Sequence, residues 1–179
     1  VYNLILGKDP LYQLQEWVQS LDLKCINNDD YENVKFTDDR FGRVLNKLFL
    51  VDRASLMTEL VVFFVKEFNI TLVRLSNDAT TIKAFGRYPG RTKTGLELKK
   101  GNSKDHRPDL KQLVFSLSIA ADGAVPIHYK CYPGNVTDDK THIETWNSLL
   151  KITGCPDFLY VADSKLCTDD QLSYIVDNG

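Results

Sequence analysis

Apolar residues recur at helical spacing in three segments of the first 69 residues, and polar residues separate these segments. Matches to the 3.6-residue period predict helices over residues 11–22, from Thr37 onward, and over 54–68. Acidic residues directly after Thr37 favour a helix start there. We expect the second helix to bury its apolar face, which consists of Phe41, Val44, Leu45, Leu48 and Phe49. The front of the chain is therefore predicted to be a small helical module.

Beyond residue 69 the pattern becomes that of strands. We expect strands over 70–76 and 79–85, broken around Asn77-Asp78, and over 112–121 and 124–132, joined at Asp122-Gly123. A helix is predicted from Thr137 to Gly154, an apolar strand over 158–162, and a last helix from Thr168. This order is typical of an α+β layered domain. With a right-handed crossover, the last strand lies parallel beside the first.

This topology would bring two distant aspartates to one place. Asp78 lies in the first strand region, and Asp163 directly follows the apolar strand. A carboxylate at such a position costs desolvation energy unless a group of opposite charge pairs with it. Mg²⁺ is such a partner, because it binds one or two carboxylates and leaves positions for water and phosphate. Without a metal, Asp78 would be a turn or bulge residue and Asp163 would cap a following turn.

The composition fits a folded chain and excludes wholesale disorder. With 179 residues, 43% hydrophobic and 26% charged, the chain suits one domain of ordinary size, or one with a helical appendage. No apolar run approaches the ~20 residues that cross a bilayer. Four widely spaced cysteines indicate free thiols in a reducing cytosol. The chain opens on Val1, and we interpret it as a fragment of a longer protein.

The net charge of −2 hides a basic segment in the middle of the chain. Between residues 83 and 111, nine Lys or Arg stand against three acidic residues, a net of +6. A basic segment between acidic flanks can hold phosphates while carboxylates elsewhere hold metal; the alternative is a solvated loop. The nine bases are Lys83, Arg87, Arg91, Lys93, Lys99, Lys100, Lys104, Arg107 and Lys111.

Three ordered segments carry a resemblance to a known family. LSNDATTIKAFGRY, GNSKDHRPDLKQLVFSLSIAADGAVPIHYKCYPGNVTDDKTH and FLYVADSKL resemble the catalytic domain of DDE transposases from prokaryotic insertion sequences. The similar branch inserts an all-β domain before its last acid. TDDRFGRVLNKLFLVDRASLMTEL resembles the helical region preceding that domain, so the resemblance covers about residues 37–179. It implies an RNase H-like mixed sheet, an antiparallel meander followed by a parallel strand, with flanking helices.

The resemblance also assigns roles to residues. Asp78 matches the first acid of the metal triad and Asp163 the second, so these two would be the catalytic and metal-binding residues. Asn135 and Asp138 match the PGNxxD element near the catalytic pocket, and we expect His142 beside a carboxylate. The third acid of the family is a later Glu. No Glu follows Asp163, so we expect the third acid beyond Gly179.

These assignments give the expected function. Residues 1–69 would be a module for dimerisation or DNA end binding, and residues 70–179 an RNase H-like catalytic domain cut off before the third acid. The implied activity is cleavage at transposon ends and strand transfer with two Mg²⁺ or Mn²⁺ ions. The implied partners are double-stranded DNA, both transposon ends and target, and a second copy of the chain. A cytoplasmic, nucleoid-associated location follows. The alternatives are a catalytically incomplete DNA-binding or dimerising fragment, and a nuclease of this fold that does not transpose.

Overall fold

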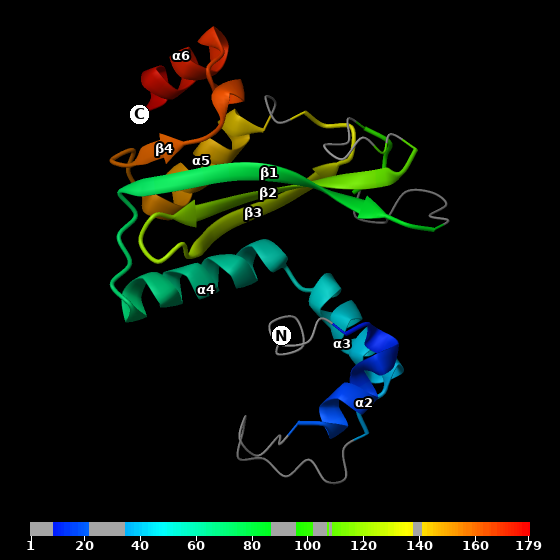
Figure 1. Ribbon diagram of the computed structural model, residues 1–179. Helices are drawn as coiled ribbons and strands as arrows, with labels where there is room; N and C mark the ends of the chain where they lie inside the picture. The colour runs from blue at the N-terminus through cyan, green and yellow to red at the C-terminus, as the bar shows by residue number, and fades with distance from the viewer. Residues whose placement is uncertain (1–8, 22–34, 87–95, 102–106, 108, 138–140) are drawn as a thin grey trace. The chain divides into compact units, whose positions relative to one another are not determined.

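The computed structural model describes residues 9–21, 35–86, 96–101, 107, 109–137 and 141–179 (Figure 1). The chain forms two compact units, Val1–Arg53 and Ala54–Gly179. Helix α4 (Arg53–Glu67) therefore belongs, apart from its first residue, to the unit that contains the sheet. The roles expected for residues 1–69, dimerisation or DNA end binding, and for residues 70–179, catalysis, stay predictions. In the described ranges no helix combines the length and apolar character needed to span a bilayer, and the described cysteines form no disulfide.

The described residues of the first unit form three helical segments, η1 (Leu11–Gln13), α2 (Leu14–Gln19) and α3 (Asp38–Leu50). As predicted, Thr37 caps α3, and its hydroxyl accepts a hydrogen bond from the Arg40 backbone N–H at 3.4 Å. The predicted burial of the apolar face of α3 is wrong, because no residue of α3 is buried. Periodicity shows that a helix face is apolar, but it does not supply the surface that would cover this face.

The second unit is built on a mixed sheet of four strands in the order β3-β2-β1-β4. Neighbours β1–β2 and β2–β3 are antiparallel, and β4 is parallel to β1, as predicted. Helix α5 (His142–Thr153) connects β3 to β4, and η4 (Ser164–Leu166) and α6 (Asp169–Asn178) follow. These strand directions are those of the expected RNase H-like arrangement. The strands are β1 (Arg74–Ala84), β2 (Lys111–Ala120), β3 (Pro126–Pro133) and β4 (Leu159–Val161).

The predicted break of the first strand at Asn77-Asp78 is wrong. Strand β1 runs through both residues and pairs with β2 without interruption from Leu75 to Ala84. Asn and Asp favour turns because their side chains can bond to the local backbone. Here the amide of Asn77 bonds across to β2 instead, so the strand continues.

Helix α5 begins later than predicted, at His142 instead of Thr137, with Thr141 at its N-cap position. It ends as predicted at Gly154, whose φ of 76° is the left-handed conformation that a C-terminal glycine supplies. Trp146 and Leu149 face inward and are buried. The helix thus covers one face of the sheet with the apolar stripe that the sequence indicated.

One cluster of buried apolar residues joins helices α4 and α5 to the sheet. It consists of Val61 from α4, Leu75, Ala120 and Ile127 from the strands, and Leu149 from α5. Complete burial of a side chain of this size stabilises the fold by about 1.5–3 kcal/mol. The cluster therefore fixes α5, and with it the crossover to β4.

The segment before β2 is tied to the end of β3 by close backbone approach. Lys99 and Gln112 exchange two backbone hydrogen bonds of 3.2 and 2.9 Å. The buried Gln112 side chain donates from Nε2 to the Gly134 carbonyl at 2.9 Å. A Cβ on Gly134 would collide with the carbonyl oxygens of Gln112 and Lys99. Only glycine permits this approach, which links the KDHRPDLKQ and PGN segments.

A polar cluster lies between β3 and α5. Glu144 of α5 accepts hydrogen bonds from Lys130 and from the Tyr132 hydroxyl, the latter at 3.1 Å. Burial raises the pKa of Glu144, but the contacts with Lys130 and Tyr132 outweigh it, so the net shift is downward. Burial, together with Lys130, lowers the pKa of nearby His128, against the opposing effect of Glu144. His128 is thus a partly buried strand histidine, and its protonated form is disfavoured.

We predict that Gly134→Ala destabilises the second unit by about 1–3 kcal/mol, since the added methyl group meets backbone that cannot move aside. Urea denaturation followed by circular dichroism measures the loss. Gly42→Ala is the matched control, because nothing lies within 4 Å of a Cβ at that helical position. Its replacement should stabilise α3 by up to ~1 kcal/mol. Equal midpoints for Gly134→Ala and the wild type would refute the close approach.

We also predict that stability falls on acidification because of His128. The unfolded chain takes up this proton near pH ~6.5, whereas the folded chain takes it up only at lower pH. The unfolded state therefore binds more protons below that pH, so the contribution is complete above about pH 6.5 and declines below it. Denaturation at pH 7.5 and 5.5 measures the slope, and His128→Gln should flatten it. Parallel pH profiles for both proteins would contradict the assignment.

Candidate functional site

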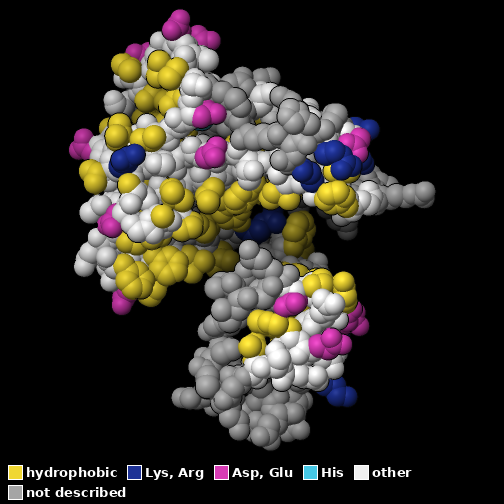
Figure 2. Space-filling view, in the orientation of Figure 1, with side chains coloured by type: hydrophobic (Ala, Val, Ile, Leu, Met, Phe, Trp, Pro, Cys, Tyr) yellow, Lys and Arg dark blue, Asp and Glu magenta, His cyan; other side chains and the backbone are white. Residues whose placement is uncertain are grey.

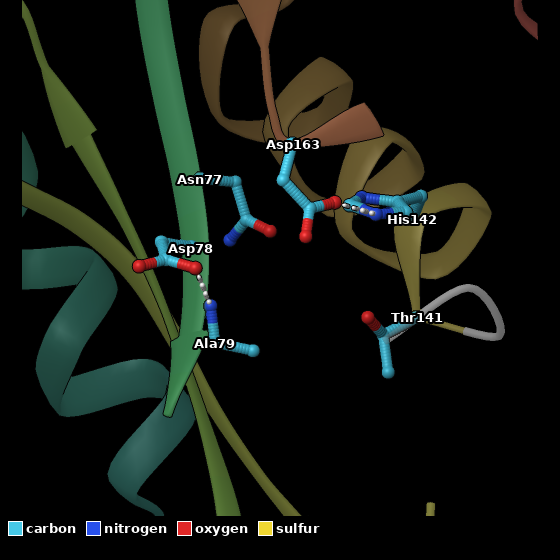
Figure 3. A pocket seen from close by; sticks show the side chains of 6 residues that line it. All are labelled: Asn77, Asp78, Ala79, Thr141, His142 and Asp163. Carbon is cyan, nitrogen blue, oxygen red and sulfur yellow. Dashed lines mark hydrogen bonds and ion pairs between the residues drawn. The ribbon is translucent and has the colours of Figure 1, made fainter. Parts of the chain in front are cut away.

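The parallel pairing of β4 with β1 brings Asp78 and Asp163 to one pocket. The paired residues are Arg74 with Leu159, Leu75 with Tyr160 and Ser76 with Val161, and both aspartates lie two residues beyond the last pair. The pocket opens where β4 ends, beside the first turn of α5 (Figure 3). It is lined by Asn77, Asp78, Ala79, Thr141, His142 and Asp163.

Asp163 lies two residues after the end of β4 and begins the turn of η4. Its backbone carbonyl accepts a hydrogen bond from the Leu166 N–H at 3.1 Å, so the residue also has the turn-starting role considered from sequence. Its side chain is 44% exposed, and one carboxylate oxygen lies 3.8 Å from Nε2 of His142. The carboxylate is therefore held beside α5 and remains accessible from solvent.

His142, the first residue of α5, is buried and lies between Asp163 and Tyr160. Its Nδ1 lies 3.1 Å from the Tyr160 hydroxyl. Burial raises the pKa of Tyr160, with further contributions from Tyr132 and Asp163, so this hydroxyl keeps its proton at neutral pH. A neutral imidazole that accepts this proton at Nδ1 carries its own hydrogen on Nε2, the nitrogen that faces Asp163. Nε2 of His142 thus faces the Asp163 carboxylate, and a role for His142 in the site stays a prediction.

Asp78 lines the same pocket but points differently. The residue is exposed, whereas Asn77 and Ala79 on either side of it are buried, as strand alternation requires. One carboxylate oxygen of Asp78 accepts a hydrogen bond from the Ala79 N–H at 2.7 Å. Figure 3 shows this carboxylate on the opposite side of β1 from the Asn77 side chain, which points toward Asp163. The two aspartates are thus neighbours whose carboxylates do not converge on one point.

Sequence reasoning missed Asn77 and Thr141 as pocket residues. Asn77 was read as part of a turn, and Thr141 as a position inside a helix that began earlier. A signal was present in β2, where Ser116 and Ser118 alternate with apolar residues. Both serines are buried beneath α5, and both contact the Asn77 amide. Polar residues on a buried strand face indicate a polar partner on the neighbouring strand.

The residues of the pocket fit a hard cation in kind. Carboxylate and amide oxygens are ligands that Mg²⁺ and Mn²⁺ accept. The set is incomplete by the standard of a three-acid site, because within the described ranges no three His, Cys, Asp or Glu residues are grouped closely enough to hold a metal. Glu144 of α5 follows the pocket residue His142 by two positions, but its carboxylate bonds to Lys130 and Tyr132 and does not line the pocket.

Part of the basic segment gathers at one end of the sheet. The register pairs Lys83 with Gln112 and Ala84 with Lys111, and the bridge to Gln112 brings Lys99 to the same end. Figure 2 shows Lys and Arg side chains clustered there. Two of these bases have acidic neighbours: Lys99 lies 2.8 Å from Glu97, and Arg107 forms two hydrogen bonds to Asp109. The Arg107 hydrogen bonds lower the pKa of Asp109 to about 2.

Several predicted site residues cannot be placed. Arg87, Arg91, Lys93, Lys104 and Asp138 lie outside the described residues. Asn135 is exposed in the turn after β3 and does not line the pocket. Lys100 is exposed beside Lys99.

Comparison with known proteins gives limited similarity. No family model matches the chain, and no curated protein matches it. Among solved structures, the chain is similar to the Mos1 transposase paired-end complex with left transposon end, at 11% identity and a TM-score of 0.38. This alignment covers 97% of the chain and 59% of the transposase chain.

Two further Mos1 structures give similar values. The pre-cleavage Mos1 transpososome is 11% identical with a TM-score of 0.37, over 96% of this chain and 58% of that chain. The mariner Mos1 paired end complex with Mg is 10% identical with a TM-score of 0.37, over 97% and 59%. The chain thus spans 59% or less of the length of these three transposase chains. Scores this low establish no relationship, and the function is therefore inferred from the chain's own residues.

Proposed function

We propose that this chain is the front part of a DDE transposase, with Asp78 and Asp163 as its first two metal-binding acids. The observation that supports the proposal most is the parallel pairing of β1 and β4, which brings both aspartates to one pocket at the end of the sheet. The motif resemblance assigns the same two residues independently of this pairing. The proposed family is that of the DDE transposases encoded by prokaryotic insertion sequences.

The chain's own residues would act by binding and orienting. Asp163 would hold a cation from the α5 side of the pocket, and His142 would keep its carboxylate in place through Nε2. Asp78 would contribute from the neighbouring strand, and a third carboxylate would have to come from outside the described residues. A bound divalent cation supplies charge stabilisation and an activated water or 3′-hydroxyl for phosphodiester cleavage and transfer. Mg²⁺ or Mn²⁺, two per site, is the proposed cofactor.

The basic end of the sheet is the proposed contact to DNA. Lys83, Lys99, Lys100 and Lys111 would meet backbone phosphates, which position the duplex without reading its sequence. A second copy of the chain is the proposed partner on DNA, since two transposon ends are joined in one reaction. The location proposed is the nucleoid.

The metal assignment predicts that Asp78→Asn and Asp163→Asn in the full-length protein abolish DNA cleavage but leave DNA binding nearly unchanged, because each removes a metal ligand and no phosphate contact. Nicking of a supercoiled plasmid in Mg²⁺ or Mn²⁺ measures cleavage, and a gel-shift assay measures binding. Ser148→Ala, a change on the α5 surface, is the control that should cut normally. A variant that cuts at the wild-type rate would remove that aspartate from the site.

The same assay separates the alternative functions. Binding without nicking by the wild-type protein would favour the non-catalytic fragment. One observation supports this alternative: within the described ranges no third acid lies near the pocket. Nicking without joining of a pre-cut end to target DNA would favour a nuclease that does not transpose.

The DNA assignment predicts that Lys100→Ala combined with Lys111→Ala weakens binding to non-specific duplex DNA. The slope of log K against log salt should fall by about 2, since each lost phosphate contact removes ~0.9. Fluorescence anisotropy at several salt concentrations measures this slope. Lys66→Ala with Lys151→Ala removes the same charge from helices α4 and α5 and is the matched control. An unchanged slope in the first variant would take this end of the sheet out of the interface.

A further inference from the structure

Tyr160 of β4 is anchored by its ring and joined to α5 by its hydroxyl. The residue is half-buried, pairs with Leu75 of β1, and packs against the buried apolar cluster of the second unit. Its ring meets the imidazole of His142 edge-on, with 6.2 Å between the centroids and 70° between the planes. Its hydroxyl lies 3.1 Å from Nδ1 of His142. Tyr160 therefore connects the short edge strand to the first residue of α5.

The hydrogen bond between Tyr160 and His142 has two possible directions, because a hydroxyl and a neutral imidazole can each donate or accept. The Asp163 carboxylate, 3.8 Å from Nε2 of His142, decides between them. An ionised carboxylate only accepts, so the nitrogen that faces it is favoured when it carries the hydrogen. Nδ1 of a neutral imidazole then has a lone pair, and Tyr160 is the donor. At 3.8 Å the contact to Asp163 is longer than a hydrogen bond, and such contacts in active sites commonly shorten when substrate binds.

Tyr132, the neighbouring tyrosine on β3, has its hydroxyl hydrogen committed elsewhere. It donates to Oε2 of Glu144 at 3.1 Å. Burial raises the pKa of the Tyr160 hydroxyl, and Tyr132 and Asp163 add to this shift. Tyr160 thus keeps at neutral pH the hydrogen that it would donate, and of the two tyrosines it is the one in contact with His142.

We propose that Tyr160 is a positioning residue: it donates to Nδ1 of His142, holds the imidazole in the Nε2–H tautomer, and so orients the Asp163 carboxylate. The use of this carboxylate in cation binding rests on the proposed function, whereas the hydrogen bond and the tautomer are testable without it. Hydrogen bonds that orient a metal-binding group are typically worth about 10–100-fold in affinity or activity. Tyr160→Phe removes the hydroxyl oxygen alone and leaves the ring in place.

The first measurement is long-range proton–nitrogen NMR correlation of the histidine rings in the 179-residue chain at about pH 8, where an unperturbed imidazole is neutral. His142→Gln identifies the signals of His142. We expect its hydrogen on Nε2, and an Nδ1 resonance displaced by the hydrogen bond from Tyr160. Tyr160→Phe should remove this displacement. A hydrogen on Nδ1 in the wild type, or an Nδ1 resonance that Tyr160→Phe leaves unchanged, would overturn the proposal.

The second measurement is nicking of a supercoiled plasmid by the full-length protein in Mg²⁺. Tyr160→Phe should lower the nicking rate about 10–100-fold and leave DNA binding unchanged. In a His142→Gln background the same substitution should add nothing, because Tyr160 acts through the imidazole. Tyr174→Phe is the matched control. It removes a half-buried hydroxyl that bonds to Asn147 of α5 outside the pocket lining, and it should nick at the wild-type rate.

The nicking assay separates positioning from a merely structural role. Wild-type nicking by Tyr160→Phe would overturn the proposal, and so would an equally large effect of this substitution with and without His142. Equal losses in Tyr160→Phe and Tyr174→Phe would also overturn it, because a general loss of stability would then explain both. Absence of nicking by the wild-type protein would instead count against the proposed function alone, and the NMR measurement would then decide the proposal.

Discussion

The short parallel pairing of β4 with β1 is the contact on which the candidate site depends. Parallel strands cannot be joined by a tight turn, so the chain must cross over the sheet between them. Helix α5 makes this crossover, and the burial of Trp146 and Leu149 holds it on the sheet. The Trp146 ring also packs on Phe158, one residue before β4, at 6.3 Å between ring centres. The position of Asp163 is therefore set by apolar packing several residues away.

Beneath α5 the sheet is polar where a stability argument alone would make it apolar. Asn77, Ser116 and Ser118 are buried there, and the Asn77 amide donates to both serine hydroxyls. His142 of the helix is buried and lines the same pocket as Asn77. Such a network costs desolvation energy and stabilises the fold only when each group is bonded. Its place at the pocket, and not in the centre of the core, is what a binding site requires and a simple core does not.

Local signals in the sequence predicted the elements whose residues act alone. The Thr37 cap, the Gly154 terminus and the turn at Asp122-Gly123 each reflect a preference of one or two residues. Predictions failed where a distant segment decides the outcome. Asn77-Asp78 has turn-forming residues, but pairing with β2 keeps it extended. The amphipathic pattern of α3 is genuine, yet no pattern within a helix identifies the surface that covers it.

The same limit applies to the site. The sequence identified Asp78 and Asp163 through strand order and resemblance, and the pairing of their strands agrees with that order. Which of two adjacent side chains faces the pocket depends on the alternation of β1, which is set by its register against β2. The mistaken break in the strand concealed this alternation, and Asn77 was missed for that reason.

Strand β4 has a further consequence because it pairs over only three residues and forms an edge of the described sheet. Edge segments with few hydrogen bonds open locally at a lower free energy than the strands between them, and their amides exchange with solvent first. A ligand that binds at Asp163, just beyond β4, would therefore increase the order of this edge strand more than that of the strands inside the sheet. Anything that binds there, whether ion or nucleic acid, would be linked by mass action to the closure of this edge.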